Sequence, residues 1–445
     1  MNDSTMDNKK RDIAILRDLA KRLLEVFNKD VQNKRRRDWR THNSLHEGPP
    51  LIWVRDFAWD EIFDPRQLKC EDNFYRSYEK HFHEILYRDS LEDDMVIEPW
   101  ITLPASYAFP SEELCRPASG NQWNIPSPSA PIAHATRLNY RWGPEIKTRK
   151  CDTEDGAWMF VPPLEKEEDL EKLVMPHHVI DETETFRTYD KLKSAIGDII
   201  DINIDRGPAY IMWTGDISSD IAFLRGLEQI MWDMIDRPSW VHKLAGFLSE
   251  AVLNVHHEAE KAGDWHLANH QNQSMPYSEE LDDPKANGPA VKKNKLWGYM
   301  AAQEFTTVSP EMFDEFILTY QLPILREFGL VSYGCCEDLT KKIPFLRKIP
   351  NLRRIAIAPW ANVRECAEQI GDQFVISWRP NPTEMVCTGF DENRIKKILE
   401  QNITIFKANN CIFDITIKDV PTVQKNPQTV VDWIKTARKI IEHFY

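Results

Sequence analysis

The sequence contains no stretch that approaches the ~18 apolar residues of a membrane-spanning helix. Its opening residues, MNDSTMDNKKRDIAIL, are polar and charged and hold no apolar core of a secretory signal. The 8 cysteines follow no spaced framework, which indicates reduced thiols rather than disulfides. From these absences we expect a cytoplasmic chain that has no membrane partner.

Motifs of several familiar enzyme classes are also missing. There is no Walker loop, no GxGxxG that opens a helix after a strand, no GxSxG and no HExxH. Nucleotide-cofactor, serine-hydrolase and zincin functions therefore lack support. The net charge is -14, and an acidic chain repels phosphate backbones, so nucleic acid is not an expected partner. The basic run at 34–37 is typical of a solvated helix face.

What the chain does have is a regular alternation of short apolar runs and helical patterns. Over residues 11–40, apolar residues recur at helical spacing. We therefore expect residues 1–48 to form a helical extension and 49–445 to form the main domain. Most strand-like runs precede a helical pattern, and the clearest of these patterns lie at 224–234 with 241–256, 310–328, 339–348, 363–370, 392–408 and 427–444. The strand-like runs lie at 51–57, 95–103, 209–214, 265–272, 330–335, 354–359, 374–379 and 412–418. Eight β–α units predict an α/β fold, a (β/α)8 TIM barrel.

Two insertions are much longer than one helix needs. One covers about 104–205 and the other about 273–296. Long loops in a compact domain are usually functional or covering, and the loops that follow barrel strands carry the active site. We therefore expect both insertions to cap the C-terminal mouth of the barrel.

Polar residues at the ends of the predicted strands are the site candidates, because barrel enzymes place their active sites there. The substrate-binding candidates at these ends are Arg55, Asp56, Trp100, Asp216, Asn272, Tyr333, Trp378, Arg379, Lys418 and Asp419. The adjacent opposite charges of Arg55–Asp56 and Lys418–Asp419 suit a carboxylate or phosphate substrate. They equally suit a ring of salt bridges inside the barrel mouth.

The segment 332–338, which reads SYGCCED, is the sharpest local feature. Thiolates bind soft metals, and a nearby carboxylate or imidazole can complete a zinc site. Side chains alternate along a strand, so we expect Tyr333 and Cys335 to share one side and Cys336 to lie on the other. The alternative is that the two cysteines are buried small hydrophobic residues.

Histidine and glutamate supply the other candidates for chemistry. His266 and His270 stand four residues apart, which on a strand separates them by about 13 Å, too far to share one metal. His270 lies nearer the C-terminal end, and we expect it to act as a metal ligand beside Cys335 and Cys336 or as a general base. A plain hydrogen-bonding role for His270 is equally open. The candidate catalytic residues are Glu98, His270 and Glu337.

Residues 207–252 resemble the middle of the uroporphyrinogen decarboxylase superfamily. The stretch reads GPAYIMWTGDISSDIAFLRGLEQIMWDMIDRPSWVHKLAGFLSEAV, and it is similar to the family's G-P strand followed by a GxExxxxDxxDxPxxVxxL helix pair. Residues 306–325, TTVSPEMFDEFILTYQLPIL, resemble the family's SPxxFxEFxxPY helix, and LVSYGCCEDL is similar to the strand after it. The resemblance covers roughly 205–440, with a weaker likeness over 50–103.

The resemblance implies a barrel enzyme of one of two kinds. Corrinoid-linked methyltransferases of the superfamily hold zinc with a His-x-Cys pair after the fifth strand and a Cys after the last. Here Tyr333 replaces the histidine and Lys418–Asp419 replaces the last cysteine, so only Cys335 carries over. The decarboxylases use an arginine-rich motif and an aspartate, for which this chain offers Arg55 and Glu98.

We therefore expect a methyltransferase of the corrinoid-linked type that acts on a small methylated substrate. The resemblance implies zinc, a corrinoid (cobalamin) carried by a partner protein, and is compatible with a homodimer. The alternative is a lyase that decarboxylates a small or tetrapyrrole carboxylic acid, with Arg55, Arg379 and Lys418 as an anion clamp. A barrel that binds a small molecule without catalysis is the third hypothesis.

Overall fold

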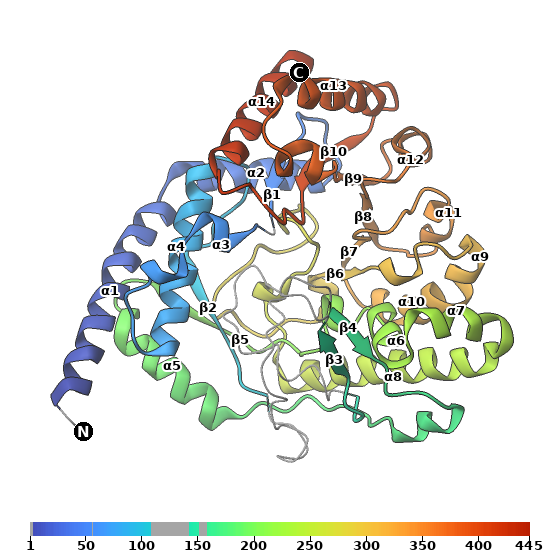
Figure 1. The fold of residues 1–445 in the computed structure, drawn as a ribbon, viewed down its shortest axis with the longest axis horizontal. Helices are drawn as coiled ribbons and strands as arrows, with labels where there is room; N and C mark the ends of the chain where they lie inside the picture. Colours follow the sequence, from blue (N-terminus) through green and yellow to red (C-terminus); the bar gives the residue numbers. More distant parts are fainter. Residues whose placement is uncertain (1–2, 56, 108–141, 151–157) are drawn as a thin grey trace.

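The computed structural model describes the chain apart from residues 1–2, 56, 108–141 and 151–157. Its α/β fold is built on a curled, fully parallel six-stranded sheet with the strand order β1-β10-β9-β8-β7-β6 (Figure 1). The strands are Ile52–Val54 (β1), Trp297–Met300 (β6), Leu330–Tyr333 (β7), Leu352–Ile357 (β8), Val375–Trp378 (β9) and Ile412–Ile417 (β10). Because all six run in one direction, their carboxyl ends lie along one edge.

Two more strands, Trp100–Pro104 (β2) and Asp201–Asp205 (β5), form a separate parallel pair. In Figure 1 the pair lies between β1 and β6, on the side that the curled sheet leaves open. The carboxylates of Asp93 and Asp94 accept the N–H groups of Val54 and Ile52 on the free edge of β1, in place of a neighbouring strand. We expected one closed sheet of eight strands. Among the described residues, these strands instead form a six-stranded sheet and the separate β2–β5 pair.

Helices follow most strands and cover the outer face of the sheet (Figure 1). The longer ones are Asp3–Phe27 (α1), Asp30–Asn43 (α2), Asn73–Leu91 (α4), Glu182–Ile196 (α5), Ser218–Arg225 (α6), Leu227–Asp236 (α7), Pro238–Ala262 (α8), Thr319–Leu325 (α10), Val363–Ile370 (α12), Glu392–Ala408 (α13) and Gln428–Phe444 (α14). The short ones are Trp59–Ile62 (α3), Pro310–Phe313 (α9) and Ile343–Leu346 (α11). An antiparallel hairpin joins Lys147–Lys150 (β3) to Trp158–Val161 (β4).

The predicted third and fourth strands were wrong, whereas the other six lie close to their predicted positions. Residues 209–214 and 265–272 contain short 3-10 helices at Met212–Thr214 and Leu267–Asn269 instead. Apart from the β3–β4 hairpin, the third and fourth strands along the chain are β5 and β6. β5 reads Asp-Ile-Asn-Ile-Asp, and its polar residues interrupt the apolar run that would have marked it in the sequence.

Apart from its first residue, Gln273, which bonds to Arg379 after β9, the insertion at 273–296 lies at the amino ends of the strands, so the expectation that it caps the C-terminal mouth was wrong. It leads into β6 rather than out of a strand, and it therefore sits at the opposite edge. Asn43 at the end of α2 donates to the carbonyls of Met275 (2.7 Å) and Tyr277 (2.9 Å) and accepts from Arg354 in β8 (2.7 Å). α2 and this insertion together close the amino end.

The first insertion, about 104–205, falls partly outside the described residues. In its described part, the β3–β4 hairpin packs against α6, and the rings of Phe160 and Phe223 have centres 4.3 Å apart. α6 comes after β5, so this contact lies on the carboxyl side of the sheet. α5, later in the same insertion, packs instead with α1 on the outside of the β2–β5 pair.

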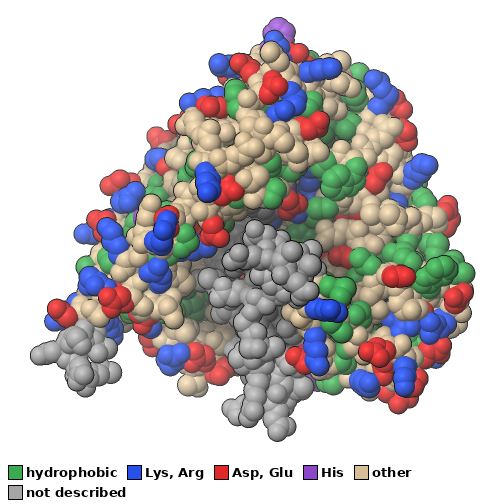
Figure 2. All heavy atoms as spheres, viewed as in Figure 1, with side chains coloured by type: hydrophobic (Ala, Val, Ile, Leu, Met, Phe, Trp, Pro, Cys, Tyr) green, Lys and Arg blue, Asp and Glu red, His purple; other side chains and the backbone are tan. Residues whose placement is uncertain are grey.

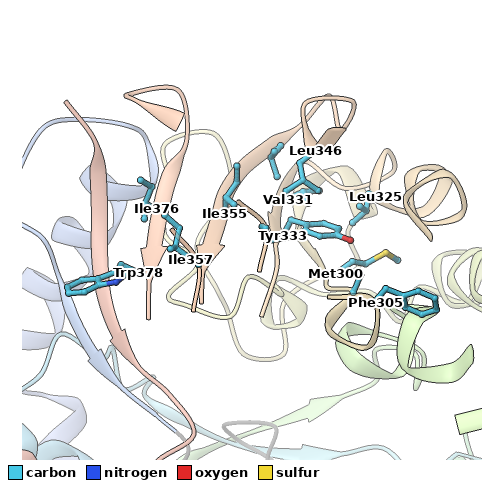
Figure 3. Close-up of a cluster of buried hydrophobic side chains, with 14 of the residues drawn as sticks. Met300, Phe305, Leu325, Val331, Tyr333, Leu346, Ile355, Ile357, Ile376 and Trp378 are labelled. Atoms are coloured by element: carbon cyan, nitrogen blue, oxygen red, sulfur yellow. The ribbon is translucent and has the colours of Figure 1, made fainter. Parts of the chain in front are cut away.

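Alternation along the strands separates an apolar outer face from a polar inner face. Val331, Ile355 and Ile376 belong to the large cluster packed between the sheet and its helices (Figure 3). On β10 the alternate positions carry Asp414 and Thr416, and Lys418 follows in the same phase. These polar side chains therefore line the inside of the curl.

Charged side chains of both signs are interspersed over the face shown in Figure 2. This mixture fits the acidic net charge of -14 and offers no extended basic surface on that face for a phosphate backbone. Within the described ranges, no helix combines the length and apolar character needed to cross a membrane.

The buried imidazole of His256 in α8 predicts a loss of stability in mild acid. Its Nε2 donates to the Tyr210 carbonyl (2.6 Å), its side chain is 2% exposed, and burial lowers its pKa to about 3. The unfolded chain binds this proton near pH 6.5, so the free energy of unfolding falls as the pH drops below that value. Between pH 6.5 and pH 5 we expect a loss of about 2 kcal/mol from this group.

Urea unfolding at the two pH values measures this loss. His256→Gln is the matched control, because its amide keeps a donor for the Tyr210 carbonyl and does not titrate. The variant is expected to lose about 2 kcal/mol less than the wild type over the same interval. Equal losses in both proteins would show that other groups carry the acid sensitivity.

Candidate functional site

Two adjacent cysteines and a lysine meet inside the curl at the carboxyl ends of the strands. Cys335 and Cys336 follow β7, and their sulfur atoms are 3.3 Å apart. Lys418 follows β10, and its Nζ is 3.1 Å from Cys335 Sγ and 3.7 Å from Cys336 Sγ. Since β8 and β9 separate β7 from β10 in the sheet, Lys418 must reach across the concave side.

Gly334 turns the chain between β7 and the two cysteines. Its φ of +98° is one that L side chains rarely adopt. A Cβ atom at this position would lie 2.6 Å from Cδ1 of Leu339, which leaves no room for a side chain. Glycine at 334 therefore allows Cys335 to leave the strand direction and join the inner cluster of Tyr299 and Ala301.

Tyr333 and Trp378, both predicted to bind substrate, belong instead to the outer apolar face (Figure 3). The Tyr333 hydroxyl donates to Gln321 (2.7 Å), and the Trp378 ring packs on Phe406 with centres 5.6 Å apart. The expectation that Tyr333 and Cys335 share one side was wrong because β7 ends at Tyr333. Neither aromatic ring reaches the thiol pair.

Glu337, predicted to be catalytic, lies at the site, but both of its carboxylate oxygens accept hydrogen bonds from backbone N–H groups. Its side chain is 1% exposed, Oε1 accepts the N–H of Ala302 (2.8 Å) and Oε2 accepts the N–H of Cys335 (2.8 Å). The carboxylate thus ties the end of β6 to the turn after β7. We interpret Glu337 as a residue that positions Cys335.

Glu337→Gln is expected to lower the free energy of unfolding by about 2 kcal/mol, because an amide NH2 group would face a buried N–H donor. Urea unfolding measures the change. Thr340→Ser, nearby in the same loop, is a mild control. If Glu337→Gln lost activity while its stability stayed unchanged, the catalytic interpretation of Glu337 would be restored.

The two thiols differ in their ionisation. Burial opposes ionisation of Cys335, but the hydrogen bond from Cys336 and the positive charges of Arg379 and Lys418 outweigh it and lower the pKa of Cys335. The hydrogen bond to Cys335 and burial raise the pKa of Cys336 far above its ordinary value. Burial opposes protonation of Lys418, but the negative charges of Cys335 and Asp419 outweigh it and raise the pKa of Lys418. These shifts favour ionisation of Cys335 over Cys336 and a protonated Lys418.

Arg379 holds the backbone of this turn in place. Its NH1 donates to the carbonyl of Cys335 (2.6 Å), and its NH2 donates to Oε1 of Gln273 (2.7 Å). The side chain is 4% exposed and follows β9 at the same edge as Lys418. Arg379 thus brings positive charge to the thiolate while its terminal nitrogens are occupied by protein groups.

Aromatic rings surround the thiols and the ammonium group. Lys418 Nζ lies 5.3 Å from the centre of the Trp213 ring, which meets Tyr299 edge-on at 5.1 Å. Trp360, 63% exposed, donates from Nε1 to the Cys336 carbonyl (2.7 Å). Sequence reasoning missed Trp213 and Tyr299 because it read 209–214 as a strand and did not recognise β6.

Comparison with known proteins gives a fold and no family. No protein-family model matches the chain, and no curated protein matches its sequence. A solved methyltransferase from Methanosarcina mazei is similar in fold, with a TM-score of 0.50 and 10% sequence identity, over 92% of this chain and 99% of that chain. At this identity the likeness concerns the fold, and the resemblance to the uroporphyrinogen decarboxylase superfamily stays a prediction.

Four predicted site residues lie at the amino ends of the strands, away from the thiols. Glu98 precedes β2, where it accepts from Tyr277 and from Arg36 (3.3 Å), and Trp100 is the first residue of that strand. His270 donates to the Asp282 carbonyl (3.0 Å) and accepts the Trp297 N–H (3.1 Å). Asn272 bonds within its own turn, to Ser274 and Met275. The structure therefore does not bring Glu98 or His270 to the thiol pair.

The remaining predicted residues lie nearer the carboxyl edge. Asp419 Oδ2 is 3.1 Å from Lys418 Nζ and 3.4 Å from Cys336 Sγ, and its side chain is 55% exposed. Asp216 is fully buried and accepts from the N–H and hydroxyl of Ser219 at the start of α6. Arg55 follows β1 and lies over the Trp53 ring at 4.9 Å. Asp56 lies outside the described residues.

The zinc that the resemblance implies does not fit these residues. Structural and catalytic zinc sites take three or four ligands from Cys, His, Asp and Glu. Across the part of the chain that is described, no group of three such residues is arranged to hold a metal. Lys418 Nζ lies within 3.7 Å of both sulfur atoms, and an ammonium group opposes a second cation there.

Proposed function

We propose that this chain is a methyl-transferring enzyme whose nucleophile is the Cys335 thiolate. The contact of 3.1 Å between Lys418 Nζ and Cys335 Sγ carries this proposal, because it places a charge-stabilised thiolate at the edge where barrel enzymes do their chemistry. The fold likeness to a methyltransferase supports the reaction class. We also infer that the six-stranded sheet and the β2–β5 pair together form the wall of a (β/α)8-type barrel.

In the proposed step, the Cys335 thiolate attacks the methyl carbon of a small methylated substrate. A sulfur–carbon bond forms with the thiolate's electron pair, and the bond from the methyl carbon to its leaving atom breaks, so that this electron pair departs on the leaving atom. The Lys418 ammonium stabilises the thiolate before the attack and the leaving atom after it. Cys336 keeps its proton and hydrogen-bonds Cys335, which holds the sulfur in position.

The hydrogen bonds of Arg379 favour methyl transfer over decarboxylation. A decarboxylase would need this guanidinium as part of an anion clamp. Its NH1 and NH2 instead donate to the Cys335 carbonyl and the Gln273 side chain. Of the expected clamp, Arg55, Arg379 and Lys418, only Lys418 contacts the thiol pair directly.

A corrinoid-carrying protein is the proposed partner, as the resemblance to the corrinoid-linked methyltransferases suggests. The corrinoid would supply a cobalt centre that can carry a methyl group, and Cys335 would be the residue of this chain that faces it. Zinc has no part in the proposal, because Lys418 supplies the positive charge beside the sulfur.

The test is transfer of an isotope-labelled methyl group to Cys335. The full chain is incubated with a panel of small methyl donors carrying deuterated methyl groups, and peptides are analysed by tandem mass spectrometry. Label is expected on Cys335 and not on Cys366, a buried thiol of α12 that bonds to Thr340 and whose pKa is raised mainly by burial. Absence of label from every donor, with and without free cob(I)alamin, would contradict the proposed function.

A further inference from the structure

The surroundings of Lys418 bear on which methyl donors the site accepts. Methylated ammonium and sulfonium groups are usually recognised by the faces of aromatic rings. The Trp213 ring packs in the same cluster as the two thiols, and Lys418 Nζ already lies 5.3 Å from its centre. The chain's own ammonium group therefore occupies the position in which a cationic donor would be held.

Lys418 also makes a second positive charge unfavourable at this point. Its Nζ is 3.1 Å from Cys335 Sγ, so any methyl carbon within reach of that sulfur is also close to the ammonium group. The carboxylate of Asp419 pairs with Lys418 at 3.1 Å and offsets part of this charge, but it is 55% exposed, so water screens its effect. At such separations, repulsion between like charges outweighs ordinary contact energies.

We propose that Lys418 and Trp213 make this site selective for uncharged methyl donors, O-methyl or S-methyl compounds whose leaving atom departs as an anion. This inference rests on the proposed function and names its donor class. When the carbon–oxygen or carbon–sulfur bond breaks, the electron pair remains on oxygen or sulfur beside the ammonium group, and no electron is gained or lost overall. An ammonium or sulfonium donor would instead release a neutral product, which Lys418 cannot stabilise.

The leaving group that suits this site best is a phenol or a thiol. Their pKa values of about 10 and 8.5 make their anions far better leaving groups than a simple alkoxide. The Trp213 ring, which is partly exposed and packs on the buried Tyr299 ring at 5.1 Å, offers apolar surface for the rest of such a donor. Aryl methyl ethers and methyl thioethers are therefore the donors we expect.

Charge probes of the thiolate test this selectivity without requiring turnover. Neutral methyl methanethiosulfonate and its trimethylammonium-ethyl analogue both modify thiolates, and each rate is divided by the rate with free glutathione. At Cys335 we expect the neutral reagent to be favoured by about tenfold or more, because a like charge at this distance changes the rate by about one log unit. Lys418→Arg is expected to keep this preference, and Lys418→Met to lose most of it.

The labelled methyl donors then separate two failures. We expect label on Cys335 from 2-methoxyphenol or dimethyl sulfide and not from tetramethylammonium. A preference near one in the wild type, a preference unchanged in Lys418→Met, or label from the cationic donor alone would overturn the donor class. A charge preference without label from any donor would instead overturn the proposed function and leave the electrostatic selection standing.

Discussion

Cys335→Ala is expected to lower methyl transfer by a factor of about 10³ or more, since it removes the nucleophile of the proposed reaction. The loss should appear in kcat, because the sulfur forms its bond to carbon only during the chemical step. Stability should change little more than for any small buried side chain, since the sulfur contacts Cys336 and Lys418 rather than the large outer core. Initial rates with the best labelled donor measure the effect.

Two other cysteine variants control this result. Cys366→Ala removes a buried thiol of α12 that bonds to Thr340 rather than to the thiol pair, and its activity per folded molecule should equal that of the wild type. Cys336→Ala removes the hydrogen bond to Cys335 but leaves Lys418 and Arg379, so we expect a loss of roughly tenfold. Full activity in Cys335→Ala would remove the thiolate from the mechanism.

The pH dependence of activity should follow the same groups. Arg379, Lys418 and the Cys336 hydrogen bond lower the pKa of Cys335 against the opposing effect of burial. A larger fraction of Cys335 is therefore ionised at neutral pH than in free cysteine, whose pKa is about 8.5. Without Lys418 the thiolate is less stable, so the rising limb of the pH–rate profile should move to higher pH in Lys418→Met.

The later strands could be predicted from the sequence because each is an apolar run followed directly by a clear helix. β7, β8, β9 and β10 all lie close to their predicted positions. Their outer faces carry the branched and aromatic residues that made the runs visible. The polar residues that end these runs were predicted to lie at the carboxyl edge of the sheet. Cys335, Arg379 and Lys418 were chosen as candidates for this reason, and they do lie at that edge.

Errors in strand position account for most of the misplaced site residues. Glu98 was read as the end of a strand, but β2 begins two positions later, so the residue lies at the amino end. His270 was assigned to a strand that does not form, and it lies before β6 instead. A shift of a few residues along a strand changes which end of the sheet a side chain occupies, and no local pattern in the sequence fixes that shift.

The contact between Lys418 and Cys335 could not be predicted from either segment alone. It depends on the curvature that brings β10 and β7 across from each other and on the turn at Gly334. The sequence indicated two substitutions in the expected zinc site. Only the structure shows that the lysine brought by one substitution lies against the cysteine that was retained.

Asp414→Leu is expected to lower the free energy of unfolding by about 3–5 kcal/mol, because it breaks a buried ion pair and leaves its partner charged. Asp414 Oδ2 accepts from Arg354 NH2 (2.6 Å) and lies 3.2 Å from His42 Nε2. Oδ1 accepts from the hydroxyls of Ser377 (3.1 Å) and Thr416 (2.8 Å). Asp414 and Arg354 have no exposed surface, so water cannot replace the lost partner.

The lowered pKa of Asp414 determines the pH range over which its ion pair stabilises the folded chain. Burial opposes ionisation of Asp414, but Arg354 and the hydrogen bonds from His42 and Thr416 outweigh it and hold its pKa well below the usual range. The carboxyl group is thus harder to protonate in the folded chain than in the unfolded chain. Its stabilising contribution is complete above pH ~4 and is lost as the pH falls from there through the folded-state pKa.

Urea unfolding of a double variant separates the unpaired charge from the loss of packing. Arg354→Met combined with Asp414→Leu removes both charges from the inside of the sheet, and we expect it to be more stable than Asp414→Leu alone. Glu400→Gln, which removes an exposed partner of Lys396 at 3.7 Å, is the control and should cost less than about 1 kcal/mol. If the double variant were the less stable of the two, the cost at Asp414 would lie in packing and hydrogen bonds rather than in the isolated charge of Arg354.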